Sequence, residues 1–190
     1  MRGGATVVSS DSESEDLGSN PSPAVFRHFA MEKNLHTIIQ KWPNCLVLVR
    51  HGRSIYNEER ELINRGILKT YTRNVKDVRN AVIPLSKKGE EQAKKTAEFL
   101  KKNYKYFDLI FTSPFKRAFK TAQIIAKKFP KSRFVIEERI REKEFGVTDG
   151  LTTDEIKQLF PYEYERKQKE KKYYYRPIGG ESYPDINLRI

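Results

Sequence analysis

Short apolar runs alternate with amphipathic stretches along most of this chain. Three of the runs are three to five residues long: Cys45–Val49, Leu109–Phe111 and Phe134–Ile136. Runs that are too short for a helix and do not alternate with polar residues are typical of strands covered on both faces of a parallel sheet. Each run ends in polar residues, so we predict three strands with polar side chains at their carboxyl ends.

The segments that separate these runs have helical periodicity. Ser86 is placed to cap a helix whose apolar face carries Ala93 and Ala97. After the second run we expect Ser113 to cap a further helix, with Pro114 at its first position. The apolar face of that helix comprises Phe115, Ala118, Phe119, Ala122 and Ile125. Because strands and helices alternate, the predicted fold class is α/β.

The amino-terminal part of the chain has a different composition. Residues 1–24 combine serine with acidic residues, glycine and proline, which predicts a disordered acidic tail. From Phe26 to Trp42 apolar residues recur at helical spacing, and Pro43 with Asn44 supplies a stop. We therefore predict an extension helix within residues 25–44 and a folded domain over residues 45–190.

Composition limits the class of protein. Lys and Arg total 37 against 25 Asp and Glu, a net charge of +12, which favours an anionic partner such as a phosphorylated metabolite, nucleic acid or lipid. The single cysteine, Cys45, excludes a disulfide framework, and the first residues lack the apolar core of a secretory signal. No apolar run approaches the roughly 20 residues of a membrane helix. A soluble protein of the cytoplasm or nucleus, without a membrane partner, is expected.

The polar residues at the predicted strand ends have the chemistry of a phosphoryl site. They are Arg50-His51-Gly52, then Ser113-Pro114 with Arg117, then Arg141-Glu142. In a parallel sheet these ends lie at one edge, where ligands bind. Arginine forks match phosphate oxygens, and Gly52 allows the backbone to approach such a ligand closely.

His51 adds a function that phosphate binding alone does not require. A neutral imidazole can attack phosphorus and carry the phosphoryl group as a covalent intermediate. Arg50 and Arg117 would neutralise charge in the transition state, and Glu142 would protonate the leaving oxygen. This chemistry needs no metal and no other cofactor.

Four motifs in order carry a family resemblance. They are Arg50-His51-Gly52-x-Ser54-x-x-Asn57, Ser113-Pro114-x-x-Arg117-Ala118-x-x-Thr121-Ala122, Arg141-Glu142-x-x-Phe145-Gly146 and Gly179-Gly180-Glu181-Ser182. Together they resemble the histidine phosphatase superfamily, which has the phosphoglycerate-mutase-like fold. The resemblance covers residues 45–190 and implies a three-layer α/β sandwich, with a mostly parallel sheet and helices on both faces.

The resemblance also implies roles for individual residues. His51 would be the phosphohistidine nucleophile and Glu142 the proton donor, while Arg50, Asn57 and Arg117 would hold the phosphate. Members of the family use a second histidine at the end of a later central strand, and the chain stops at Ile190 before that strand would arrive. His28 and His36 lie upstream and do not match the missing motif. The chain is therefore expected to be a fragment or a degenerate member, truncated at its carboxyl end.

Several alternatives stay open on the sequence alone. Asn57 could merely cap a helix, and the segment Glu58–Ile83 could be a substrate lid or a solvated loop. The stretch Lys169–Arg176 interleaves cations with aromatic residues and could stack nucleic acid, although a charged helix with a packed aromatic edge is the stronger interpretation. The predicted function is a phosphatase acting on a phosphorylated small molecule or phosphoprotein; the alternatives are a mutase and an inactive phosphate- or nucleic-acid-binding remnant.

Overall fold

A computed structural model describes residues 43–190 of the chain. The predicted acidic tail over residues 1–24 and nearly all of the predicted extension helix over residues 25–44 lie outside the described residues. Apart from residues 43–46, the described part belongs to one compact unit, Val47–Ile190.

The described part of this unit is mixed α/β. Its strands are β1 (Leu109–Thr112) and β2 (Arg133–Ile136). Its helices are α1 (Ile55–Asn64), α2 (Arg73–Lys76), α3 (Lys87–Asn103), α4 (Lys116–Ala126), α5 (Thr153–Leu159), α6 (Pro161–Tyr174) and α7 (Tyr183–Arg189). Short 3-10 turns are η2 (Asn80–Val82), η3 (Glu138–Ile140) and η4 (Gly146–Thr148).

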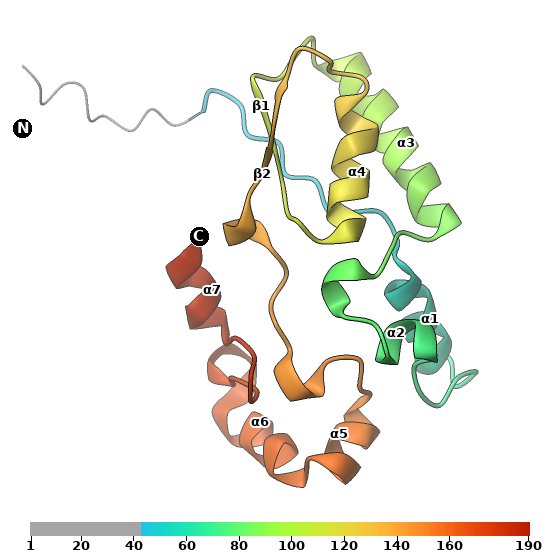
Figure 1. Ribbon diagram of the computed structural model, residues 1–190, viewed down its shortest axis with the longest axis vertical. Coiled ribbons are helices and arrows are strands. Elements are labelled where there is room, and N and C mark those ends of the chain that lie inside the picture. Colours follow the sequence, from blue (N-terminus) through green and yellow to red (C-terminus); the bar gives the residue numbers. More distant parts are fainter. Residues whose placement is uncertain (1–42) are drawn as a thin grey trace, which may run out of the picture. The chain divides into compact units, whose positions relative to one another are not determined.

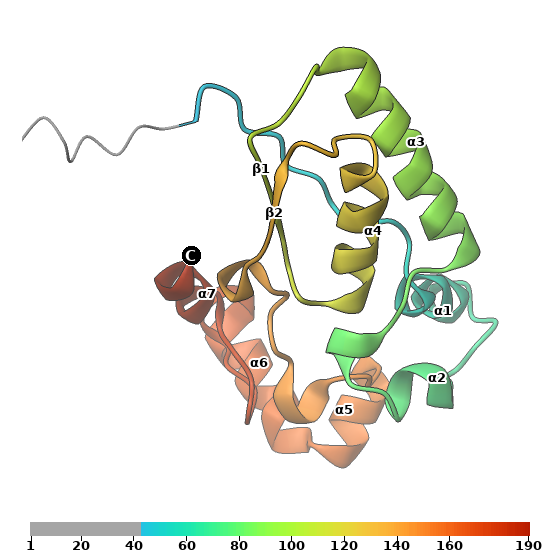
Figure 2. The same ribbon diagram turned by 45° about the horizontal axis from the view of Figure 1, so that its top comes forward.

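The sheet within residues 43–190 consists of β1 and β2, which run parallel with Leu109 opposite Arg133 and Thr112 opposite Ile136. The chain connects the two strands through α4, and α3 lies beside α4, as Figures 1 and 2 show. Ala97 and Leu100 of α3 meet Ile125 and Phe129 in a hydrophobic core. Parallel strands need such a crossover helix, so this part of the α/β prediction is confirmed.

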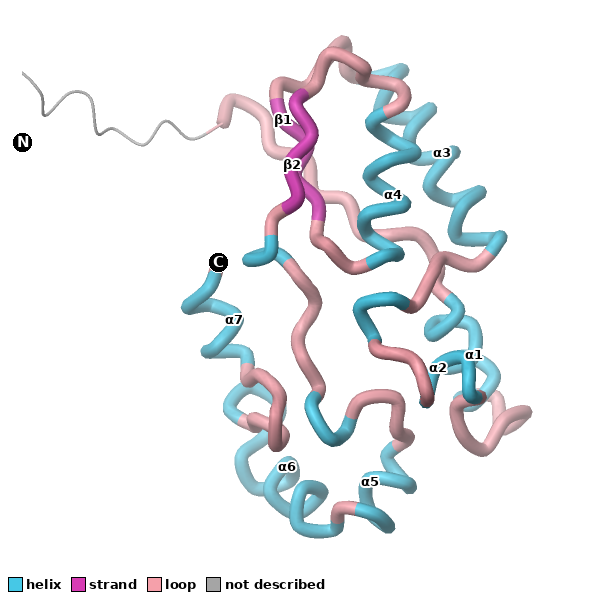
Figure 3. The backbone as a smooth tube through the Cα atoms, viewed as in Figure 1, coloured by secondary structure: helices cyan, strands magenta, loops and turns pink. Residues whose placement is uncertain are grey.

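The predicted first strand, Cys45–Val49, is not a strand. Figure 3 shows this segment as loop, and its side chains are largely exposed, with Leu48 at 86%. The backbone there has no ladder partner among the described residues, since the sheet of that part holds β1 and β2 alone. An apolar run becomes a strand only when another strand supplies its hydrogen bonds. The many-stranded, three-layer sandwich expected from the sequence is correspondingly reduced here to a two-stranded sheet.

The start of α4 also differs from the prediction. The helix begins at Lys116 with Phe115 as its N-cap residue, so Ser113 and Pro114 precede it. The Ser113 hydroxyl still accepts a hydrogen bond from the Phe115 backbone N–H, at 3.3 Å. The serine therefore closes the turn that leads into the helix instead of capping the helix itself.

The segment Glu58–Ile83 is not a solvated loop. It includes most of α1 and all of α2 and η2, and Tyr71, Val75 and Ile83 form a buried cluster beneath them. Glu59 is buried and accepts hydrogen bonds from the Thr72 backbone N–H, at 2.8 Å, and from its hydroxyl, at 2.6 Å. These contacts lie within the segment and give it a buried core of its own.

A buried carboxylate ties α6 to the turn that follows it. Glu163 of α6 is 2% exposed and accepts hydrogen bonds from the Tyr175 hydroxyl at 2.9 Å and the Ile178 N–H at 3.2 Å. Tyr173 stacks on Tyr183 of α7 with ring centroids 6.1 Å apart. Tyr173 and Tyr175 of the stretch Lys169–Arg176 therefore contact other residues of this chain, as expected for a charged helix with a packed aromatic edge. No helix in the part of the chain that the structure describes is long and apolar enough to span a membrane.

Candidate active site

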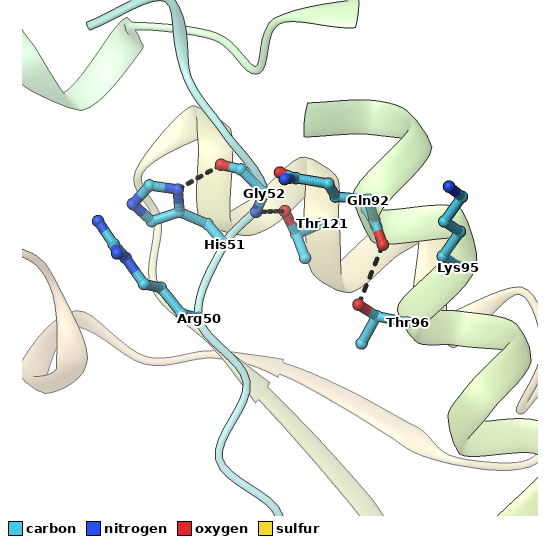
Figure 4. A pocket seen from close by; sticks show the side chains of 8 residues that line it. Arg50, His51, Gly52, Gln92, Lys95, Thr96 and Thr121 are labelled. Carbon is cyan, nitrogen blue, oxygen red and sulfur yellow. Dashed lines mark hydrogen bonds between the residues drawn. The ribbon is translucent and has the colours of Figure 1, made fainter. Parts of the chain in front are cut away.

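The His51 side chain is held in one tautomer by the backbone of the next residue. Nδ1 lies 2.7 Å from the carbonyl oxygen of Gly52 (Figure 4). A carbonyl can only accept a hydrogen bond, so Nδ1 carries the proton and donates it. The lone pair of the neutral ring is therefore on Nε2.

Arg117 approaches that nitrogen directly. Its Nε donates to Nε2 of His51 at 3.3 Å. A guanidinium can only donate, so this contact and the Gly52 contact require the same tautomer. Arg117 is the second residue of α4 and is 5% exposed, which places its charge at the nitrogen that would attack phosphorus.

The surroundings of His51 favour its neutral form. Burial is the largest influence and lowers the pKa of the imidazole below 6.5, and the charges of Arg117 and Arg50 lower it further. The hydrogen bond to Gly52 and the charge of Glu142 act in the opposite direction but do not reverse the shift. At pH 7 the ring is therefore neutral, as a nucleophile must be.

The backbone around His51 is fixed by a close approach to α3. A Cβ on Gly52 would lie 2.2 Å from the carbonyl oxygen of Gly89, and a Cβ on Gly89 would lie 1.9 Å from that of Arg53. The expected reason for Gly52 is the close approach of a ligand, whereas in the structure the backbone of Gly89 lies against it. Both glycines are required because two backbones touch.

Thr121 and Arg117 connect this backbone to α4. The Thr121 hydroxyl accepts a hydrogen bond from the Gly52 N–H at 3.2 Å and donates to the carbonyl of Arg117 at 2.9 Å. Sequence reasoning assigned no role to Thr121. The available signal was its position one helical turn after Arg117, which places both on one face of α4.

Glu142 and Arg50 complete the group of predicted residues near His51. Arg117 Nη2 is 3.8 Å from a carboxylate oxygen of Glu142, which is 47% exposed. Arg50 is exposed and lines a pocket together with His51 (Figure 4). The other residues that line this pocket are Gly52, Gln92, Ala93, Lys95, Thr96 and Thr121. Four of the five predicted site residues therefore come together around His51.

Asn57 has a different place. Its side-chain oxygen accepts from the backbone N–H of Ser54 at 3.1 Å, and the Ser54 hydroxyl accepts from the Asn57 N–H at 3.2 Å. This reciprocal capping box begins α1. The capping alternative is confirmed, and a role for Asn57 in holding phosphate stays a prediction.

Two groups near Arg117 had no sequence signal. Arg117 Nη1 donates to the backbone carbonyl of Asn80 at 2.7 Å. A carbonyl is present at every position, so its use here could not be predicted from residue type. Asp149 directly follows η4, and its charge and that of Arg117 each favour the ionised form of the other.

Comparison with known proteins decides the family. Residues 46–190 match the sequence profile of the histidine phosphatase superfamily, branch 1. The chain belongs to this superfamily. The resemblance inferred from the four motifs is thereby confirmed, and members of the superfamily act on phosphorylated substrates.

The relatives of this histidine phosphatase domain include both phosphatases and mutases. It is 31% identical over 153 residues to a fructose-2,6-bisphosphatase of Saccharomyces cerevisiae, covering 80% of this chain and 29% of that protein. It is 33% identical over 137 residues to the phosphoglycerate mutase-like protein 4 of Arabidopsis thaliana, covering 72% and 53%. The chain thus spans about half the length, or less, of these two relatives.

Solved structures agree on the fold. A mycobacterial glucosyl-3-phosphoglycerate phosphatase superimposes with a TM-score of 0.54 at 25% identity, covering 74% of this chain and 57% of that one. An alpha-ribazole phosphatase of Shigella flexneri gives a TM-score of 0.58 at 22% identity, with 74% and 60% covered. At that identity the second similarity concerns the fold alone.

Proposed function

We propose that this domain hydrolyses phosphomonoesters through a phosphohistidine formed on His51. The observation that carries the proposal is the placement of a neutral imidazole whose Nε2 faces the Arg117 guanidinium at 3.3 Å. Burial of Arg117 disfavours its charge and lowers its pKa, and a guanidinium kept beside His51 despite that cost fits a site that binds an anion. An incoming phosphate dianion would take over the donors of Arg117 and Arg50.

The proposed reaction has two steps. In the first, His51 Nε2 attacks phosphorus, the bond to the ester oxygen breaks, and the Glu142 carboxyl group gives its proton to that oxygen. In the second, Glu142 takes a proton from water while the water oxygen attacks the phosphohistidine, releasing inorganic phosphate and neutral His51. Arg50 and Arg117, together with Asn57, would bind the three equatorial oxygens in both steps.

The test is hydrolysis of a generic aryl phosphate by the chain and by its His51→Ala variant. We expect the variant to lose both turnover and the acid-labile phosphoenzyme, while a chelator leaves the activity of the unaltered chain intact. If the variant retains either turnover or the phosphoenzyme, His51 is not the nucleophile. Loss of activity on chelation, with rescue by a divalent ion, would indicate metal-assisted hydrolysis instead.

A phosphoglycerate-mutase-type transfer is the second candidate, because mutases occur among the relatives at comparable identity. A 2,3-bisphosphoglycerate-dependent phosphoglycerate mutase of Bartonella tribocorum is 32% identical over 147 residues, covering 76% of this chain and 64% of that protein. The two reactions differ only in whether water or a substrate hydroxyl accepts the phosphoryl group. Release of inorganic phosphate from the phosphoenzyme without added acceptor favours the phosphatase, and release only with a phosphorylated acceptor favours the mutase.

An inactive phosphate-binding domain is the third outcome of the same assay. It would bind inorganic phosphate in a manner that depends on Arg117 yet form no phosphoenzyme. The chain carries two histidines besides His51, His28 and His36, and neither lies in the described residues.

A further inference from the structure

The fourth sequence motif, Gly179-Gly180-Glu181-Ser182, has no part in the proposed reaction, yet its backbone lies against the third motif. Phe145 pairs with Gly180 in an antiparallel bridge. A Cβ on Gly180 would lie 2.7 Å from the carbonyl oxygen of Glu144, so the two backbones touch there. The fourth motif is therefore placed to hold the segment that carries Glu142.

Glu181 binds residues on both sides of Glu142. Its Oε1 accepts a hydrogen bond from Arg141 Nη2 at 2.6 Å, and its Oε2 accepts one from the Glu144 N–H at 3.0 Å. The N–H of Glu181 donates to the Glu144 carbonyl at 2.9 Å. Arg141 directly precedes Glu142, and Glu144 is two residues after it. One residue thus holds the segment at two points, with Glu142 between them.

Arg189, at the end of α7, orients the Glu181 carboxylate. Its Nε and Nη2 donate to the two carboxylate oxygens at 3.0 and 3.3 Å, and Nη2 also donates to the Arg141 carbonyl at 2.9 Å. The side chains of Glu181 and Arg189 are only 13% and 14% exposed. A two-pronged contact between an arginine and a carboxylate fixes the orientation of both groups.

Glu142 has weaker contacts of its own. One carboxylate oxygen accepts from the N–H of the next residue, Lys143, at 3.3 Å, and the other lies 3.8 Å from Arg117 Nη2. The side chain is 47% exposed. Its position therefore depends on where the backbone of its segment is held.

The charge of Glu181 strengthens this hold. Burial raises the pKa of its carboxyl group, but the hydrogen bonds from Arg189 and the Glu144 N–H and the charges of Arg189 and Arg141 outweigh burial and lower the pKa. The carboxylate is therefore ionised at neutral pH, and hydrogen bonds to an ionised acceptor are stronger than those to a neutral one.

We infer that Glu181 is a positioning residue, which holds Arg141 and Glu144 and thereby sets the Glu142 carboxyl group relative to Arg117 and His51. The inference rests on the proposed function for its catalytic consequence, because Glu142 is the proton donor there, and on geometry alone for the hold on the segment. Glu181 acts through Glu142 and is not a catalytic residue.

The first measurement compares two esters that need the proton to different degrees. Phenyl phosphate releases a strongly basic phenoxide, so its cleavage depends on the general acid, whereas 4-nitrophenyl phosphate releases a weakly basic anion. We expect Glu181→Ala to lower kcat/KM about tenfold for phenyl phosphate and less than about threefold for 4-nitrophenyl phosphate. A purely structural role would lower both values by the same factor.

Two further variants serve as controls for the ratio of these kcat/KM values. Glu170 also contacts an arginine, Arg166, through both carboxylate oxygens, and Glu170→Ala should leave the ratio within about twofold. In a Glu142→Gln background, Glu181→Ala should not change the ratio further, because the two residues affect the proton transfer as one unit.

The second measurement is hydrogen exchange of the Glu144 amide by NMR, which needs no turnover. We expect Glu181→Ala to accelerate this exchange about tenfold, because the amide loses its charged acceptor. Glu170→Ala should leave the exchange unchanged. If Glu181→Ala does not fold, Glu181→Gln, which keeps one acceptor but loses the charge, should shift both measurements in the same directions by smaller factors.

Equal losses for the two esters, or unchanged exchange of the Glu144 amide, in a folded variant would overturn the inference. If the unaltered chain hydrolyses neither ester, the proposed function is wrong, and the pKa of His51 by NMR replaces the kinetic measurement. The charge of Glu142 raises that pKa, so displacement of Glu142 in Glu181→Ala should lower it, and a Glu142→Gln background should abolish the fall. An unchanged His51 pKa would then overturn the inference.

Discussion

At the scale of single residues, the chemistry depends on which nitrogen of His51 carries the proton. The Gly52 carbonyl accepts from Nδ1 and the Arg117 guanidinium donates to Nε2, so both contacts select the neutral ring. A second arginine, Arg50, also lowers the pKa of this ring, while Glu142 raises it. Burial and the two arginine charges therefore favour the unprotonated ring that the proposed attack on phosphorus requires.

This arrangement predicts the titration of His51. Its pKa should lie below the ordinary value of 6.5, because burial and both arginines disfavour the cation. Arg50→Ala should raise it and Glu142→Gln should lower it further, both measured by NMR on the folded chain. A wild-type pKa at or above 6.5, or shifts of the opposite sign, would contradict the described electrostatics.

Gly89 gives a second prediction at this scale. Alanine is favoured over glycine within helices by about 1 kcal/mol, so Gly89→Ala in α3 would ordinarily stabilise the protein. Here the new Cβ would meet the Arg53 carbonyl at 1.9 Å, and the backbone next to His51 would have to move. We expect a net loss of about 1–3 kcal/mol in the free energy of unfolding.

Urea unfolding would measure that loss, with Lys94→Ala on the exposed side of the same helix as the matched control. The control should change the free energy of unfolding by less than about 0.5 kcal/mol. Equal stability of the two variants would show that the approach between Gly89 and Arg53 is not tight.

At the scale of elements, α6 is anchored by Glu163 at its first turn. Besides Tyr175 and Ile178, Arg166 donates to this carboxylate at 2.8 Å. Burial alone would raise the pKa of Glu163, but the Tyr175, Arg166 and Ile178 hydrogen bonds outweigh it and lower the pKa. The turn after α6, which leads to Gly179-Gly180, is therefore tied to the helix by an ionised group.

We expect Glu163→Gln to destabilise the fold by about 1–2 kcal/mol at pH 7, because the amide cannot satisfy all three donors of the carboxylate. Because the folded pKa lies below the unfolded value of 4.5, the stabilisation is complete above pH 4.5 and is lost as the pH falls through the folded pKa. The difference between wild type and variant in thermal melts should accordingly shrink below pH 4.5. Glu165→Gln, at an exposed position of α6, should show no such difference at any pH.

At the scale of the whole described unit, the sheet leaves apolar side chains uncovered. Leu46 and Leu48 are exposed in the segment before His51, and Phe111 and Ile136 are exposed on β1 and β2. Exposed apolar side chains next to unpaired strand edges favour association with another chain.

We therefore expect residues 1–190 alone to be marginally stable and prone to associate, unless a partner strand covers this surface. Sedimentation and thermal unfolding at several protein concentrations would test this expectation. A monodisperse monomer with a cooperative transition at high temperature would contradict it. Leu48→Lys, which removes an apolar group at the exposed segment, should reduce association more than Leu159→Lys on α5.

The order of motifs along the chain determined the family and most of the site. His51, Arg117 and Glu142 each lie downstream of an apolar run. The runs before Arg117 and Glu142 form the parallel strands β1 and β2, whose carboxyl ends lie at one edge. The starts of α1 and α5 are also determined locally. Each is a capping box between residues three positions apart, Ser54 with Asn57 and Thr152 with Glu155. Helical periodicity likewise located α3, and the short unbroken apolar runs located β1 and β2, because these patterns lie within the sequence of a single element.

Tertiary structure decided the features that depend on residues far apart in the chain. The run Cys45–Val49 has the composition of a strand but no strand beside it, because pairing depends on a partner and not on the run itself. The tautomer of His51 follows from a carbonyl and a guanidinium, and Arg117 is held by the backbone carbonyl of Asn80. Nearly every residue has the same backbone N–H and carbonyl groups, so the sequence does not indicate which of them bind a given side chain. Only the folded structure shows those hydrogen bonds.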